Sequence, residues 1–137
     1  MTLEYGLNKL DEIAQNIIKH SSLKTYLFFG EMGVGKTTLI KALVKQLGSE
    51  DNVSSPTYSL VNEYMSKGKP IYHFDFYRIN SIEEVYDIGF EEYLSQEAHI
   101  IIEWPELIKP LWPEKFVKIE LNLVDDEKRK IEICEVF

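Results

Sequence analysis

The segment from Gly30 to Thr37 is the part of this sequence whose residue types and spacing most clearly predict chemistry. Residues 30–37 read GEMGVGKT and satisfy the pattern G-x-x-x-x-G-K-[ST] of a phosphate-binding loop. Glycines let backbone amides turn toward phosphate oxygens, and the start of a helix adds positive potential. We expect Lys36 to reach the outer phosphates of a bound nucleotide and the Thr37 hydroxyl to ligate Mg²⁺. The predicted phosphate-binding residues are Glu31, Met32, Gly33, Val34, Gly35, Lys36, Thr37 and Thr38.

Two predicted strands end in an acidic residue, and nucleotide hydrolysis needs carboxylates to hold the metal and orient water. The strand at residues 71–75 ends in Asp75, and the strand at residues 100–103 ends in Glu103. Ligands of open α/β sheets bind beyond the carboxyl ends of the strands, so we expect both carboxylates near the phosphates. Both are predicted to be catalytic: Asp75 as a Walker B aspartate, and Glu103 as a Mg²⁺ ligand or a residue that positions water.

Three further features each have two interpretations. Residues 55–57, Ser-Pro-Thr, lie where many nucleotide hydrolases have a switch loop that senses the γ-phosphate, but a turn-forming Ser-Pro explains the spacing equally well. Arg78 is either a charge-stabilising finger or a surface or partner contact. His73 shares a strand face with Asp75, yet a histidine in the core is the interpretation we prefer.

A guanine-recognition pattern near the N-terminus is a coincidence by its position. Asn8, Lys9 and Asp11 spell N-K-x-D, the motif with which GTPases recognise guanine. That motif should follow the acidic strands at a strand end, whereas here it precedes the phosphate loop on a predicted helix. We therefore expect ATP rather than GTP as the nucleotide.

The hydrophobic pattern predicts the elements that would position these residues. Apolar residues recur at helical spacing over residues 8–20 and 39–47. Strands are predicted at residues 25–29, 58–65, 70–75, 99–104, 117–123 and around 131–133, with short helices beginning at Ser81 and near residues 91–95. This order predicts a single α/β domain over residues 1–137. We expect a three-layer P-loop sandwich whose mixed, mainly parallel sheet has parallel central strands, antiparallel additions at an edge and a C-terminal β-hairpin.

The composition is that of a globular protein with an acidic balance. Of 137 residues, 45% are hydrophobic and 28% are charged, and the formal net charge is −8. With two arginines, Arg78 and Arg129, a basic face that binds nucleic acid directly is hard to build. The apolar runs are too short to cross a membrane, and the N-terminus lacks the order of a signal peptide. The single Cys134 forms no internal disulfide, so we expect a cytoplasmic protein.

Four motifs in order give the sequence a close resemblance to one family. They are GEMGVGKTT at residues 30–38, SPTYSLVNEY at residues 55–64, HFDFYR at residues 73–78 and EWPE at residues 103–106. They span most of the chain, and together they are far more specific than a phosphate loop alone. The sequence therefore resembles the TsaE (YjeE) family, the bacterial ATPases of tRNA threonylcarbamoyladenosine synthesis.

The resemblance implies an activity, partners and roles for individual residues. Members of the family bind and slowly hydrolyse ATP with Mg²⁺, and they work with two proteins, TsaB and TsaD, in modifying the adenosine beside the anticodon. Contact with tRNA would then be indirect, through the complex. By position, the matches are Lys36 and Thr37 to the phosphate and magnesium residues, Glu103 to the metal-binding glutamate, Asp75 to the Walker B acid, Thr57 to the catalytic switch threonine, and Trp104 to a tryptophan near the nucleotide.

The resemblance is less complete where the adenine would bind. The family's N-terminal helix usually has a Leu-Gly pair where this chain has Ile13 and Ala14. Residues around Leu7 flank the adenine in the family. A basic residue near the final hairpin also contacts the nucleotide there, and Arg129 and Lys130 are both candidates.

Two other functions use the same loop. A small-molecule phosphotransferase is one. Kinases of this fold usually need an arginine-rich lid, and a chain with two arginines can hardly form one. A nucleotide-binding scaffold without useful hydrolysis is the other. A weakly hydrolysing regulatory ATPase is our leading hypothesis.

Overall fold

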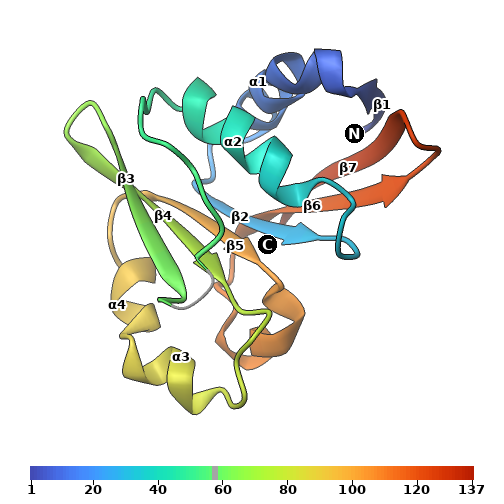
Figure 1. The fold of residues 1–137 in the computed structure, drawn as a ribbon. Coiled ribbons are helices and arrows are strands. Elements are labelled where there is room, and N and C mark those ends of the chain that lie inside the picture. Colours follow the sequence, from blue (N-terminus) through green and yellow to red (C-terminus); the bar gives the residue numbers. More distant parts are fainter. Residues whose placement is uncertain (57–58) are drawn as a thin grey trace.

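The structure is a computed structural model that describes residues 1–56 and 59–137. The described residues form a seven-stranded sheet in the order β1-β7-β6-β2-β5-β4-β3 (Figure 1). The strands are β1 (Thr2–Gly6), β2 (Thr25–Phe29), β3 (Val61–Ser66), β4 (Lys69–Asp75), β5 (His99–Glu103), β6 (Phe116–Leu123) and β7 (Lys128–Val136).

The centre of the sheet is parallel, and both of its edges are antiparallel. β6, β2, β5 and β4 run parallel to one another. β7 and β1 extend the sheet antiparallel at one edge, and β3 does so at the other. The mixed sheet, its parallel centre and the C-terminal hairpin of β6 and β7 confirm the sequence prediction. Two details differ: antiparallel strands lie at both edges rather than at one, and β1 was not predicted.

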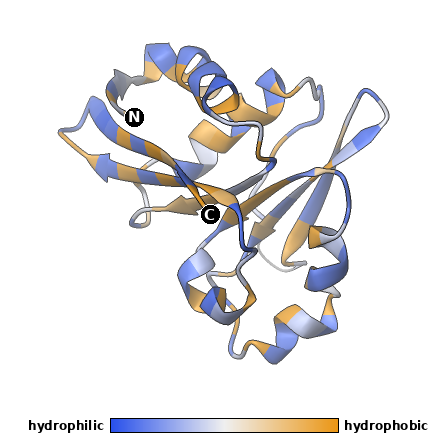
Figure 2. Cartoon of the chain, turned by 180° about the vertical axis from the view of Figure 1, so that it is seen from behind, coloured by the Kyte–Doolittle hydropathy of each residue, from blue (hydrophilic) through white to orange (hydrophobic). Residues whose placement is uncertain are grey.

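Helices cover both faces of the sheet and complete the three layers. α1 (Leu10–His20), preceded by the one-turn η1 (Leu7–Lys9), and α2 (Lys36–Gln46) lie on one face; α3 (Glu83–Asp87), α4 (Phe90–Leu94) and η2 (Pro105–Leu111) lie on the other (Figure 1). Buried apolar residues form one cluster on each face. In Figure 2 the central strands carry much hydrophobic colour, and the helices carry both hydrophobic and hydrophilic colour. In the part of the chain that the structure describes, no helix is long and apolar enough to cross a membrane.

Several element boundaries differ by a few residues from the predicted ones, as the third helix and the third strand illustrate. The carboxylate of Glu84 accepts a hydrogen bond from the Ser81 backbone N–H at 3.1 Å, which is half of the predicted capping box. The first helical residue is nevertheless Glu83. The strand predicted at residues 58–65 is observed from Val61 onward, and Tyr58 lies outside the described residues.

Gly30 lies where β2 turns into the phosphate loop, and its surroundings leave no room for a side chain. Its φ is 146°, and a Cβ there would lie 2.9 Å from both the Leu121 carbonyl oxygen and Val34 Cγ1. We expect Gly30→Ala to lower the free energy of unfolding by about 3 kcal/mol, because backbone strain adds to a clash with backbone. Gly68→Ala is the control, since its φ is 80° and nothing lies within 4 Å of an added Cβ. It should lose about 1 kcal/mol. Urea denaturation compares the two variants, and equal losses would contradict the clash.

Candidate functional site

The phosphate loop connects β2 to α2 and faces a cleft at the carboxyl ends of the parallel strands. Gly33 and Gly35 have φ angles of 81° and 105°, which favour glycine at both turns of the loop. The cleft has a volume of about 360 Å³. It is lined by Met32, Gly33, Gly35, Lys36, Thr37, Thr38, Ser55, Asp75, Tyr77, Glu103 and Trp104. The fold thus gathers most of the residues predicted from the sequence around one cleft.

The Lys36 side chain is buried beneath the loop and makes two close contacts. Its Nζ donates a hydrogen bond to the Gly30 carbonyl oxygen at 2.6 Å and lies 3.7 Å from the centroid of the Trp104 ring. Burial lowers the pKa of Lys36, and nearby carboxylates, Glu103 first among them, oppose that shift. An ammonium group that has already lost most of its water is well suited to bind phosphate oxygens.

Trp104 adopts an unusual backbone conformation that places its ring over Lys36. Its φ and ψ are 55° and 48°, in the left-handed region, which costs a residue with a side chain about 1 kcal/mol or more. The ring also lies 4.8 Å from that of Tyr77, measured between centroids. Trp104 directly follows Glu103, so this strain is stored beside a predicted catalytic residue, as is common at functional sites.

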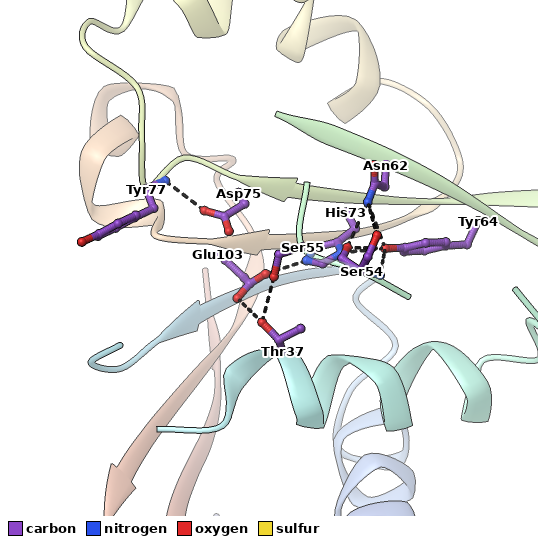
Figure 3. A network of polar contacts seen from close by, with 9 residues as sticks. All are labelled: Thr37, Ser54, Ser55, Asn62, Tyr64, His73, Asp75, Tyr77 and Glu103. Carbon is purple, nitrogen blue, oxygen red and sulfur yellow. Dashed lines mark hydrogen bonds and ion pairs between the residues drawn. The ribbon is translucent and has the colours of Figure 1, made fainter. Parts of the chain in front are cut away.

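Thr37 and Glu103 bring two oxygen atoms together at the start of α2. The Thr37 hydroxyl donates to Glu103 Oε1 at 3.3 Å and lies 3.2 Å from the Ser55 hydroxyl (Figure 3). Such oxygen donors suit Mg²⁺, which usually takes one or two protein ligands and completes its shell with water and phosphates. Within residues 1–56 and 59–137, no three His, Cys, Asp or Glu side chains converge as a metal cage would require. The residues present therefore fit a cation that is shared with phosphates.

Asp75 lies opposite Glu103 at the ends of β4 and β5. The two residues are paired in register, so their side chains point to the same face of the sheet. Asp75 Oδ1 accepts a hydrogen bond from the Tyr77 backbone N–H at 2.9 Å. Burial raises the pKa of Asp75, and the Tyr77 N–H opposes that shift. A partly desolvated carboxylate on the wall of the cleft is placed to orient water near phosphates.

His73 lies in the core, which is the interpretation preferred from the sequence, and it also makes a contact that the sequence does not reveal. The imidazole is fully buried, with Nε2 at 2.7 Å from Glu103 Oε2 and Nδ1 at 3.0 Å from the Tyr64 hydroxyl (Figure 3). One signal was available, because His73 shares a face of β4 with Asp75. The register that places β5 and its terminal Glu103 alongside is not visible in the sequence.

Of the two basic candidates in the C-terminal hairpin, Arg129 is the one beside the phosphate loop. Its Nε donates to the Val34 carbonyl oxygen at 2.8 Å, inside the loop. Lys130 Nζ instead lies 3.7 Å from the carboxylate of Glu132, at the surface. Arg129 therefore supports the backbone of the loop, a distinction that the sequence had left open.

Other predicted residues lie away from the cleft or outside the described chain. Thr57 is outside the described residues, and its catalytic role stays a prediction. Glu31 and Val34 line a neighbouring cavity, and Val34 is itself buried. Arg78 and Leu7 are exposed at the surface.

Comparison with known proteins gives a consistent family match for this chain. Residues 6–131 match the protein family described as threonylcarbamoyl adenosine biosynthesis protein TsaE. The chain is 37% identical over 131 residues to the tRNA threonylcarbamoyladenosine biosynthesis protein TsaE of Haemophilus influenzae, covering 96% of this chain and 81% of that protein. It is 39% identical over 135 residues to the protein of the same name from Rickettsia felis, covering 98% of this chain and 75% of that protein.

A more distant relative and a solved structure extend the comparison. The Bacillus subtilis protein of the same name is 34% identical over 107 residues, covering 78% of this chain and 66% of that protein. The crystal structure of Bacillus subtilis YdiB has the same fold, with a TM-score of 0.73 and 23% sequence identity over 99% of this chain and 86% of that chain. The family match and the extent of these identities show that the chain belongs to the TsaE family.

Proposed function

We propose that this protein binds ATP with Mg²⁺ in the cleft at the start of α2 and hydrolyses it slowly. One observation supports the proposal most strongly. The Thr37 hydroxyl, from the start of a helix, and the Glu103 carboxylate, from the end of a strand, lie 3.3 Å apart beside the phosphate loop. A hydroxyl and a carboxylate in this relation are what a nucleotide-bound magnesium ion requires from the protein.

Each residue of the cleft has a distinct part in the proposed activity. The loop amides and Lys36 bind the phosphates, with charge-assisted hydrogen bonds replacing the present bond from Lys36 to Gly30. Thr37 and Glu103 hold the cation, which when bound supplies positive charge to neutralise the phosphate oxygens. Asp75 orients the attacking water, and Thr57 is the proposed switch residue that senses the γ-phosphate.

Slow hydrolysis is expected from where the two arginines lie. Arg78 is exposed, Arg129 donates to the Val34 carbonyl oxygen, and neither lines the cleft. An arginine that stabilises the transition state accelerates phosphoryl transfer by about 10³–10⁵-fold. Because this chain directs neither arginine to the cleft, rapid turnover would need a residue from a partner.

We place this activity in the biosynthesis of tRNA threonylcarbamoyladenosine, for which the relatives are named. The expected partners are TsaB and TsaD, with the adenosine beside the anticodon as the modified base. The net charge of −8 supports a role in which tRNA is held by the partners rather than by this chain.

The rate of ATP hydrolysis with and without TsaB and TsaD tests this function. We expect a slow, Mg²⁺-dependent rate for the protein alone and a rise of about tenfold or more when both partners are added. Phosphoryl transfer to a small acceptor without partners would instead favour a small-molecule phosphotransferase. Nucleotide binding without hydrolysis, even in the complex, would instead favour a nucleotide-binding scaffold.

A further inference from the structure

The Glu103 carboxylate is held from two sides in a largely buried position. Its side chain is 3% exposed, with Oε1 accepting from the Thr37 hydroxyl at 3.3 Å. On the opposite side, Oε2 lies 2.7 Å from His73 Nε2, and His73 has no exposed surface. An ionised carboxylate can only accept hydrogen bonds, so the hydrogen of this contact belongs to the imidazole. Glu103 thus has one oxygen toward the cleft and one fixed in the core.

A second buried side chain fixes the imidazole ring in turn. The Tyr64 hydroxyl lies 3.0 Å from His73 Nδ1 and 3.0 Å from the Ser54 carbonyl oxygen. The Asn62 side chain donates to the same carbonyl oxygen at 2.9 Å. Figure 3 shows the resulting row of contacts from Ser54 through Tyr64 and His73 to Glu103. Tyr64 lies within β3, His73 lies within β4, and Glu103 ends β5.

We propose that His73 and Tyr64 are positioning residues, which hold Glu103 in the orientation that presents Oε1 to Thr37 and the cation. The proposal rests on the proposed function, because Glu103 is taken to be a metal ligand. Groups that hydrogen-bond to a metal ligand fix its orientation, and their loss typically lowers metal affinity or activity by about 10–100-fold. The row also includes the backbone of Ser54, next to Ser55 at the cleft, so the placement of this segment and of Glu103 are linked.

Four variants separate positioning from simple packing. His73→Leu removes the contact with Glu103, and His73→Gln restores an N–H donor at a similar distance along the side chain. Tyr64→Phe removes the hydroxyl from the row. Tyr72→Phe is its matched control, since Tyr72 is also buried and donates a hydrogen bond, to Gln96 at 2.8 Å, but on the opposite face of the sheet.

The measurement is the affinity for ATP by calorimetry with MgCl₂ and with EDTA, together with the single-turnover hydrolysis rate. We expect His73→Leu to reduce the gain in affinity from Mg²⁺ by about tenfold, His73→Gln to recover it to within about threefold, and Tyr64→Phe to fall between them. Tyr72→Phe should match the wild type. Affinity in EDTA should change little in any variant, because the phosphate contacts are made elsewhere. If His73→Leu does not fold, the comparison of His73→Gln and Tyr64→Phe with Tyr72→Phe gives the result.

Three outcomes would overturn the proposal. If Mg²⁺ increased the ATP affinity of Tyr64→Phe and His73→Leu as much as that of the wild type, Glu103 would not need these side chains to orient it. Equal losses of ATP affinity with MgCl₂ and with EDTA would indicate that His73 and Tyr64 have a general packing role. If the wild-type protein bound no ATP under either condition, the proposed function itself would fail, and this inference with it.

Discussion

Lys36→Met should lose most of the affinity for ATP while the protein stays as stable as the wild type, to within about 1 kcal/mol, or becomes more stable. Charge-assisted hydrogen bonds from Lys36 to phosphate oxygens contribute about 1.5–3 kcal/mol, so their loss should raise the dissociation constant for ATP about 10–150-fold. Methionine keeps an unbranched apolar chain beneath the Trp104 ring, so packing is largely retained. Isothermal titration with ATP measures the affinity.

The stability of this variant follows from the sign of the pKa shift. Burial lowers the pKa of Lys36 below its ordinary value of 10.5, so the folded state binds this proton less tightly than the unfolded chain does. The charged Lys36 therefore destabilises the folded protein at neutral pH, and this destabilisation is lost as the pH rises from the lowered pKa toward 10.5. Methionine removes it at every pH. Urea denaturation at neutral and alkaline pH should show the variant's relative advantage shrinking as the pH rises.

Lys41→Met is the control, because Lys41 is an exposed residue of the same helix. It should leave both the affinity for ATP and the pH dependence of stability unchanged. Unchanged ATP affinity in Lys36→Met would contradict the placement of the phosphates over the loop.

The central elements of the fold were predictable because their signals are local. A continuous apolar run buried on both faces identified β2 and β5, and helical spacing after a glycine loop identified α2. β1 has no comparable signal: its five residues have mixed polarity, and they become a strand by pairing with residues 128–132 at the other end of the chain. Such pairing is a property of the tertiary structure, which a local pattern does not encode.

The site residues divide in the same way. Some are identified by local motifs, and others come together only through the register of neighbouring strands. Lys36 belongs to a contiguous motif, and Asp75 and Glu103 are identified by ending their strands, so sequence analysis proposed them as site residues. The supporting contacts were missed, because His73 meets Glu103 across two strands that are joined by 23 intervening residues. Arg129 reaches the loop from still further along the chain. These contacts depend on the order of strands in the sheet.

Glu103→Gln should abolish the gain in ATP affinity from Mg²⁺ and lower the single-turnover hydrolysis rate by about 100-fold or more. The amide has the shape of the carboxylate and retains an oxygen, but it carries no charge to attract a divalent cation. Affinity for ATP in EDTA should stay near that of the wild type or rise slightly, since a negative charge near the phosphates is removed. Calorimetry with MgCl₂ and with EDTA measures both quantities on the same protein.

Glu106→Gln separates a ligand oxygen from a general effect of negative potential. Glu106 is exposed, lies three residues beyond Glu103, and acts on the charge of Lys36 in the same direction. If only the negative potential mattered, Glu106→Gln would lose a proportionate part of the Mg²⁺ dependence of ATP affinity. If Glu103 is a ligand of the cation, Glu106→Gln should lose none of it. Wild-type Mg²⁺ dependence in Glu103→Gln would mean that the cation is held elsewhere. The short contact between Glu103 and His73 would then serve the core alone, because a neutral amide oxygen can still accept the same imidazole hydrogen.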